Sequence, residues 1–196
     1  MLNKLLKLFF KTNRTIYRQA ARLNRKYRLS RYQKGDQKIL EISGGRMPLS
    51  DDYLNVDILD APEVDVVTDI NGPLPFESES ADVIISVATL EHFNLNDMRS
   101  ILKEFHRILK IGGRLEIGVP SLHKIMERYR QDGCTDEVLR YVHGAQKDQY
   151  DIHLCILDAA RFIGELSALS FKEVKEEDYD FERHDRRYMM KIIAVK

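Results

Sequence analysis

The chain has 196 residues, of which 43% are hydrophobic, so it is long enough for one globular domain with its own core and a short extension. The formal net charge is zero, and no apolar run approaches the roughly 18 residues needed to cross a bilayer. Composition therefore indicates neither a membrane-spanning helix nor a strongly basic nucleic-acid-binding protein. The two cysteines are far apart, and no His/Cys cluster has metal-ligand spacing, which predicts reduced thiols in a cytoplasmic protein and no metal site.

Positive charge is concentrated near the N-terminus. Residues 1–34 contain eleven of the 31 Lys and Arg residues and no acid, since the first acidic residue is Asp36. Basic side chains recur at steps of three or four, which places them on one face of a helix opposite an apolar face. These positions are Lys4, Lys7, Lys11, Arg14, Arg18, Arg22 and Arg25. The pattern predicts a basic amphipathic helical extension over residues 1–34, interrupted near Thr12–Asn13, before a domain at residues 35–196.

The sequence leaves open three alternative roles for such a helix. Residues 1–30 could lie on an anionic membrane surface, which would put the protein at the cytosolic membrane face. They could instead pack on their own domain or on a second subunit of a homodimer, or they could contact nucleic acid, against which the neutral overall charge argues. The apolar stretch Leu5–Phe10 is short, contains Lys7 and is followed by no small-residue cleavage site, so we do not expect it to act as a signal peptide.

Strands and helices alternate along the domain. Five strands are expected at residues 38–45, 53–58, 64–69, 81–87 and 114–119. A helix is expected at Leu95–Lys110, capped by Asn94 or Asn96 and ended by Gly112-Gly113. Residues 121–156 are polar and mixed, and they are followed by a helix at 157–169 and closing strands at 171–174 and 188–195. This alternation predicts an α/β fold with a mostly parallel sheet.

Acidic residues stand at or near the ends of the first three predicted strands. They are Glu41, Asp57 and Asp69. Ligands of open α/β sheets bind at the carboxyl ends of the strands, so these carboxylates should border the ligand space. Their oxygens suit a ligand with several hydroxyls and an amine.

Five short motifs follow one another over about 50 residues. They are Leu74-Pro-Phe76 before the buried strand Ala81-Asp-Val-Ile-Ile-Ser86, then Leu90-Glu-His92, then Glu104-Phe-His-Arg-Ile-Leu-Lys110, then Gly112-Gly113, and finally Val119-Pro120. In this order and spacing they closely resemble the class I S-adenosylmethionine (SAM) methyltransferases, of the type 11 kind. The resemblance implies a Rossmann-like α/β fold, with a mostly parallel seven-stranded or reduced sheet, and SAM as cofactor.

The same resemblance implies a set of cofactor-binding residues. The glycine turn after the first strand would approach the methionine part of SAM, because glycine lets the backbone come close and its amides can face a carboxylate. Asp57 would bind the ribose hydroxyls, and Asp69 with Ile70 would lie near the adenine. The full set is Glu41, Ser43, Gly44, Gly45, Asp57, Asp69, Ile70 and Val87. Ser43 and Met47 stand where the family's outer glycines would be, which is a departure from its pattern.

The spacing of the acids is a second departure. Asp57 follows Glu41 by 16 residues and Asp69 follows Asp57 by 12, which leaves no room for full crossover helices. The first two helices of the family fold should therefore be shortened or replaced by loops. We hypothesise that the N-terminal helix or a second subunit covers the surface that they would leave.

Methyl transfer to a hydroxyl needs a proton acceptor, for which histidine is well suited. The leading candidates are His92, directly after the fourth strand, and His143 and His153, in the region after the fifth strand where such enzymes build acceptor sites. Glu91, His123 and Asp151 are further candidates for this role. Residues Ser86–Glu91 replace the Asn/Asp-Pro-Pro-aromatic motif of enzymes that methylate base amines.

An analogy with similar proteins narrows the chemical class of the methyl acceptor further. Small relatives of this kind resemble enzymes of surface polysaccharide biosynthesis, which points to a hydroxyl of a small molecule or a lipid-linked glycan. Two alternatives stay open: an inactive scaffold that keeps the fold, favoured by the eroded glycine motif, and an RNA methyltransferase that anchors through the basic helix.

Overall fold

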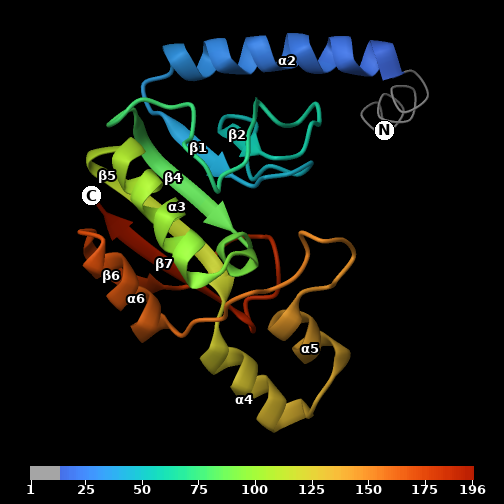
Figure 1. Ribbon diagram of the computed structural model, residues 1–196, viewed down its shortest axis with the longest axis vertical. Coiled ribbons are helices and arrows are strands. Elements are labelled where there is room, and N and C mark those ends of the chain that lie inside the picture. Colours follow the sequence, from blue (N-terminus) through green and yellow to red (C-terminus); the bar gives the residue numbers. More distant parts are fainter. Residues whose placement is uncertain (1–13) are drawn as a thin grey trace.

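The computed structural model describes residues 14–196, and it describes side chains from Ala21 onward. The expected interruption near Thr12–Asn13, and the side chains of the amphipathic pattern before Ala21, lie outside the described residues. Helix α2, Arg14–Lys34, is continuous and lies along one end of the molecule, next to the first two strands (Figure 1). A helix is therefore confirmed over the second part of the predicted extension.

The described residues form a seven-stranded sheet in the order β3-β2-β1-β4-β5-β7-β6. Its strands are β1 Ile39–Ile42, β2 Leu54–Asp57, β3 Val66–Val67, β4 Ala81–Val87, β5 Leu109–Pro120, β6 Lys172–Glu177 and β7 Met189–Val195. The first five are parallel, while β7 runs antiparallel to both β5 and β6. This confirms the predicted α/β architecture with a mostly parallel sheet.

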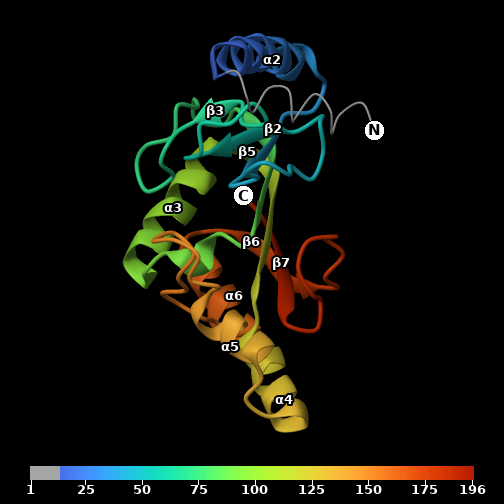
Figure 2. The same cartoon turned by 90° about the vertical axis from the view of Figure 1, so that its right-hand side faces the viewer.

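One face of the sheet is covered by helices. Helix α3, Leu95–Ile108, and helix α6, Ala159–Ala168, lie on the same side (Figure 2). Their apolar side chains, including Phe105 and Phe162, pack with strand residues such as Leu40 and Ile84 into the main core. Burial of this area is the largest favourable contribution to folding.

The opposite face is covered by irregular chain. Val83, Ile85 and Val87 of β4 pack there against Leu49, Tyr53 and Phe181, from the β1–β2 and β6–β7 connections. No helix stands between β1 and β2 or between β2 and β3, as the spacing of the acids predicted.

Helix α2 packs on its own domain. Leu29 and Tyr32 pack against the main core, and Arg25 and Arg28 hydrogen-bond to the loop between β2 and β3. Of the uses weighed for the extension, packing on its own domain is thus observed for the C-terminal part of α2.

Two expected boundaries differ from the structure. Helix α3 starts after Asn94 as predicted, since the Asn94 side chain accepts from the backbone amides of Asn96 and Asp97, but it ends at Ile108. Leu109 already pairs with Ala81, and Gly112-Gly113 lies within β5 instead of ending the helix. Strand pairing across the sheet here overrides the local stop signal.

The polar stretch 121–156 contains two helices that the sequence pattern did not predict. They are α4 Leu122–Asp132, capped by Ser121, and α5 Asp136–His143, capped by Thr135. Each helix buries few apolar side chains, chiefly Ile125 and Val138. Together they project from one end of the molecule (Figure 1).

Candidate functional site

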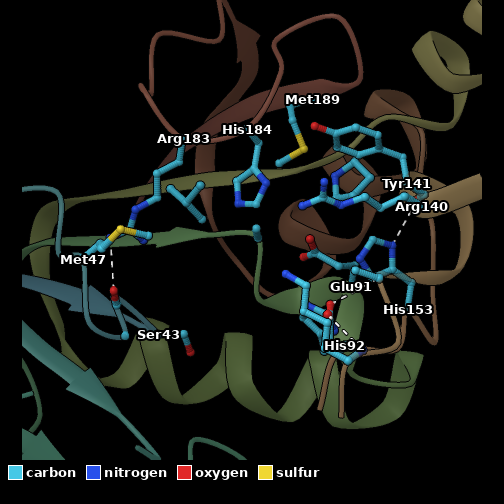
Figure 3. A pocket seen from close by; sticks show the side chains of 18 of the residues that line it. Ser43, Met47, Glu91, His92, Arg140, Tyr141, His153, Arg183, His184 and Met189 are labelled. Carbon is cyan, nitrogen blue, oxygen red and sulfur yellow. Dashed lines mark hydrogen bonds between the residues drawn. The ribbon is translucent and has the colours of Figure 1, made fainter. Parts of the chain in front are cut away.

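A cavity of about 340 Å³ opens at the carboxyl ends of β1, β4 and β5. One side is formed by the glycine turn at residues 43–47 and by Val87–Ala88. The other side is formed by Glu91 and His92 of the short helix η1, Leu90–His92, by His153, and by Arg140 and Tyr141 of α5. The β6–β7 connection contributes Arg183 and His184 (Figure 3). This is the edge where α/β sheets bind ligands.

The glycine turn is held in a strained and tightly packed conformation. Ser43 and Gly45 both have positive φ, 60° and 58°. A side chain on Gly44 would meet the Asn55 side-chain oxygen at 2.4 Å and Glu41 at 2.9 Å, so only glycine fits there. The turn therefore brings bare backbone to the cavity wall, although Ser43 stands at a position that ordinarily favours glycine.

The side chain of Glu41 stabilises the glycine turn. Its side chain is buried, it accepts a hydrogen bond from the Leu49 amide at 2.7 Å, and it forms an ion pair with Arg183 at 2.9 Å. Burial raises the pKa of Glu41, against the opposing charge of Arg183 and the hydrogen bond from Leu49. Arg183 also donates to the Gly44 carbonyl at 3.2 Å, which ties the β6–β7 connection to the turn.

Asp57, the acid expected to bind the ribose, accepts hydrogen bonds from backbone amides. One oxygen of Asp57 accepts from the Gly45 amide at 2.9 Å, and the other accepts from the Leu59 amide at 2.8 Å. Asp57 is buried and does not line the cavity. Its contacts link the end of β2 to the glycine turn.

The predicted cofactor residues are thus only partly brought together. Ser43, Gly44, Gly45 and Val87 line the cavity, whereas Glu41 and Asp57 lie behind the turn. Asp69 is exposed, and it accepts a hydrogen bond from the Asn71 amide within a loop. Ile70 is buried in the main core.

Two of the three predicted histidines meet in the cavity. The rings of His92 and His153 lie edge to face, with centroids 5.0 Å apart. Nδ1 of His92 is 3.1 Å from the Ile152 carbonyl, and Nδ1 of His153 is 3.0 Å from the Tyr141 carbonyl. Burial lowers the pKa of His153, and the charges of His92 and His143 act in the same direction. The hydrogen bond with the Tyr141 carbonyl and the charge of Asp151 act against this lowering of the pKa.

The third histidine is placed differently. Nδ1 of His143 lies 2.9 Å from the Gly144 carbonyl and 3.3 Å from the Gln146 side chain, and its ring does not line the cavity. Its backbone carbonyl accepts from the His153 amide at 3.2 Å. His143 thus contacts the segment that carries His153.

Glu91 lies beside the histidine pair. Its side chain is buried, and burial raises its pKa to about 8. One carboxylate oxygen, Oε2, has no hydrogen-bond partner among the described residues. The sequence predicted no metal site, yet Glu91, His92 and His153 each offer a ligand atom within 4.8 Å of the other two.

Several residues of the cavity wall carry no signal in the sequence. Arg140, Tyr141, Arg183, His184 and Met189 come from α5 and from the end of the chain, far from any motif. Only the return of the β6–β7 connection to the glycine turn brings Arg183 there.

Within residues 14–196, no helix combines the length and apolarity that a membrane span requires.

Part of the chain resembles a known protein family. Residues 30–117 match the sequence model of a methyltransferase domain. No curated protein sequence matches the chain at a significant level.

Solved structures match almost the whole chain. A SAM-dependent methyltransferase from Archaeoglobus fulgidus has a TM-score of 0.57 and 17% identity, over 97% of this chain and 99% of that one. A SAM-dependent methyltransferase of Thermotoga maritima, described as a possible histamine N-methyltransferase, has a TM-score of 0.57 and 17% identity, over 95% and 96%. A phosphoethanolamine N-methyltransferase from Haemonchus contortus, in complex with S-adenosylhomocysteine, has a TM-score of 0.55 and 13% identity, over 87% and 53%.

The protein therefore has the Rossmann-like α/β fold of the class I SAM-dependent methyltransferases. The resemblance seen in its motifs agrees with both comparisons: residues 30–117 match the model of a methyltransferase domain, and the fold matches that of solved SAM-dependent methyltransferases.

Proposed function

We propose that the protein transfers a methyl group from SAM to a hydroxyl of a sugar or another small polar acceptor. The observation that supports this is the two-sided cavity: a bare glycine turn on one side, and a histidine pair with a buried carboxylate on the other.

The glycine-turn side suits the cofactor. Ser43, Gly44 and Gly45 present backbone to the cavity, and Val87 adds an apolar contact at the end of β4. Arg183 beside the turn places a cation where the methionine carboxylate of SAM would come to lie.

The histidine side suits a hydroxyl acceptor. Methyl transfer from a sulfonium is an in-line displacement in which positioning can contribute up to about 7–11 kcal/mol. A hydroxyl must also lose its proton. Because Nδ1 of both His92 and His153 is held at a carbonyl oxygen, the Nε2 lone pairs remain available to assist that loss.

The charge of the cavity supports an anionic acceptor. Arg140 and Lys147 line the wall near the histidines. A lipid-linked glycan with its phosphate groups would satisfy these cations. Peripheral membrane contact through residues 1–30 belongs to the same proposal, and the exposed Leu23 and Tyr27 of α2 offer apolar side chains for it.

A second candidate is an inactive scaffold that keeps the fold. The engagement of Asp57 by the Gly45 and Leu59 amides favours it, because the acid expected at the ribose is already hydrogen-bonded.

Calorimetric titration with SAM and S-adenosylhomocysteine separates the two candidates. Micromolar binding is expected, and labelled methyl transfer to sugar hydroxyls should then fall about 10²–10⁴-fold in His153→Ala, with SAM affinity unchanged. His123→Ala, at an exposed position of α4, is the matched control and should keep wild-type activity. No SAM binding up to millimolar concentration would favour the scaffold.

A further inference from the structure

Glu91, His92 and His153 form a compact group of metal-ligating side chains on the cavity wall (Figure 3). One ligand atom from each lies within 4.8 Å of the other two. Three ligands of one Zn²⁺ ion, each about 2.0–2.2 Å from the metal, lie at most about 4.4 Å apart. Only a small movement of the side chains separates the observed arrangement from coordination.

Both histidines are oriented as metal ligands usually are. A backbone carbonyl can only accept a hydrogen bond, so Nδ1 of His92 donates to Ile152 and Nδ1 of His153 donates to Tyr141. This fixes the tautomer and leaves an unprotonated Nε2 on each ring. A ligating histidine commonly donates its second nitrogen to a carbonyl or carboxylate in this way.

The carboxylate of Glu91 lacks a compensating charge. Its side chain is buried, and Oε2 has no hydrogen-bond partner among the residues that the structure describes. Burying a carboxylate without a partner is costly. A cation held by Glu91 and by one ring nitrogen of each histidine would provide that partner.

The backbone holds the group together across a long sequence separation. The Glu91 carbonyl accepts from the amides of Leu154 and Cys155, at 2.7 Å and 3.2 Å. The His153 amide donates to His143. Backbone hydrogen bonds therefore fix the segment that carries His153 against η1, and such support from the surrounding backbone is what a precise binding site needs.

We propose that Glu91, His92 and His153 bind one divalent first-row transition metal ion, such as Zn²⁺ or Mn²⁺, on the acceptor side of the cavity. Two imidazole nitrogens favour such ions over Mg²⁺ and Ca²⁺, which prefer oxygen ligands. Three protein ligands leave coordination positions open toward the cavity, where a bound acceptor hydroxyl would lose its proton to solvent water more readily. In this metal-bound form the two Nε2 atoms are ligands, and the metal takes the place of the general base. This catalytic role rests on the proposed function, whereas the binding of the metal does not.

The test uses the full chain, without a histidine tag and freed of metal by a chelator. It is titrated calorimetrically with Zn²⁺ and separately with Mn²⁺. One ion per chain is expected to bind, and Glu91→Gln and His153→Ala should each weaken binding by more than about tenfold. His123→Ala and Cys134→Ser, at exposed positions outside the group, should bind as the wild type does.

Melting temperatures of all variants confirm that each is folded, and Glu91→Gln keeps the shape of the side chain if His153→Ala should fail to fold. Absence of binding in the wild type, or wild-type affinity in folded Glu91→Gln, would overturn the metal site. SAM titration of the same metal-free protein is read separately. SAM binding without metal binding rejects the metal site alone, and metal binding without SAM binding rejects the proposed methyl transfer alone.

Discussion

At the scale of single residues, Asp57 connects the end of β2 to the glycine turn, which we propose as the cofactor side of the cavity. Its two oxygens accept from the Gly45 and Leu59 amides, so the carboxylate fixes the glycine turn. The conformation of the turn therefore depends on a side chain that does not line the cavity.

We expect Asp57→Ala to weaken SAM binding by more than about tenfold. Loss of a charged hydrogen bond costs about 1.5–3 kcal/mol, and each 1.4 kcal/mol is about a factor of ten in affinity. Titration calorimetry measures the affinity. Asp57→Asn, which keeps one acceptor oxygen, should lose less, and an unchanged affinity in Asp57→Ala would remove this residue from the cofactor site.

At the scale of elements, the sequence motifs act mainly as structural ties. Glu104 of α3 accepts from the Leu74 amide at 2.8 Å, and Arg107, one turn later, donates to the Phe76 carbonyl at 2.8 Å. The two side chains also form an ion pair at 2.6 Å. The spacing of three residues puts both on the same face of the helix, where they hold the Leu74-Pro-Phe76 loop against α3.

Helix α2 is attached to the domain by a buried ion pair. Arg28 donates to Asp65 at 3.0 Å and to the Tyr53 carbonyl at 2.8 Å, and both charged side chains are buried. Burial raises the pKa of Asp65, while the Asn55 amide and the Arg28 charge act against the rise.

We expect Arg28→Ala to lower the free energy of unfolding by about 3–5 kcal/mol, because it leaves the Asp65 carboxylate buried without its partner. Chemical denaturation measures this. Arg31→Ala is the matched control on the same helix, since its ion pair with Asp52 is exposed and its loss should change stability little. Equal losses in the two variants would contradict a specific role for the buried pair.

At the scale of the whole molecule, ion pairs join the layers and make stability depend on acid pH. Hydrogen bonding to Arg107 lowers the pKa of Glu104, and hydrogen bonding to Arg99 lowers that of Glu165 and links α6 to α3. A carboxylate with a lowered folded pKa stabilises the protein above its ordinary pKa of about 4.3, and this contribution is lost as the pH falls through the folded value.

The melting temperature of the wild type should therefore fall more between pH 6 and pH 3 than that of the double variant with Glu104→Gln and Glu165→Gln. The variant is less stable at pH 6 but has no such carboxylates to protonate. Differential scanning calorimetry over this range gives both slopes. Parallel slopes would show that these pairs do not contribute to the acid dependence.

The sequence by itself determined the structural features that depend on neighbouring residues. Strand β4 occupies Ala81–Val87 as its apolar run predicted, the Asn94 cap starts α3, and short spacing between Glu41, Asp57 and Asp69 excluded the first crossover helices. These features depend on residues that lie close together in the sequence, so periodicity, capping and loop length are enough to reveal them.

Only the tertiary structure decided how distant segments meet at the cavity. His153 reaches Glu91 and His92 because the backbone after α5 hydrogen-bonds to η1, and Arg183 reaches the glycine turn because the β6–β7 connection returns across the sheet. Neither contact leaves a periodic or spaced pattern, since each depends on the path of the chain through the whole fold. The grouping of three possible metal ligands was therefore outside the reach of the sequence, although each of the three residues was visible in it.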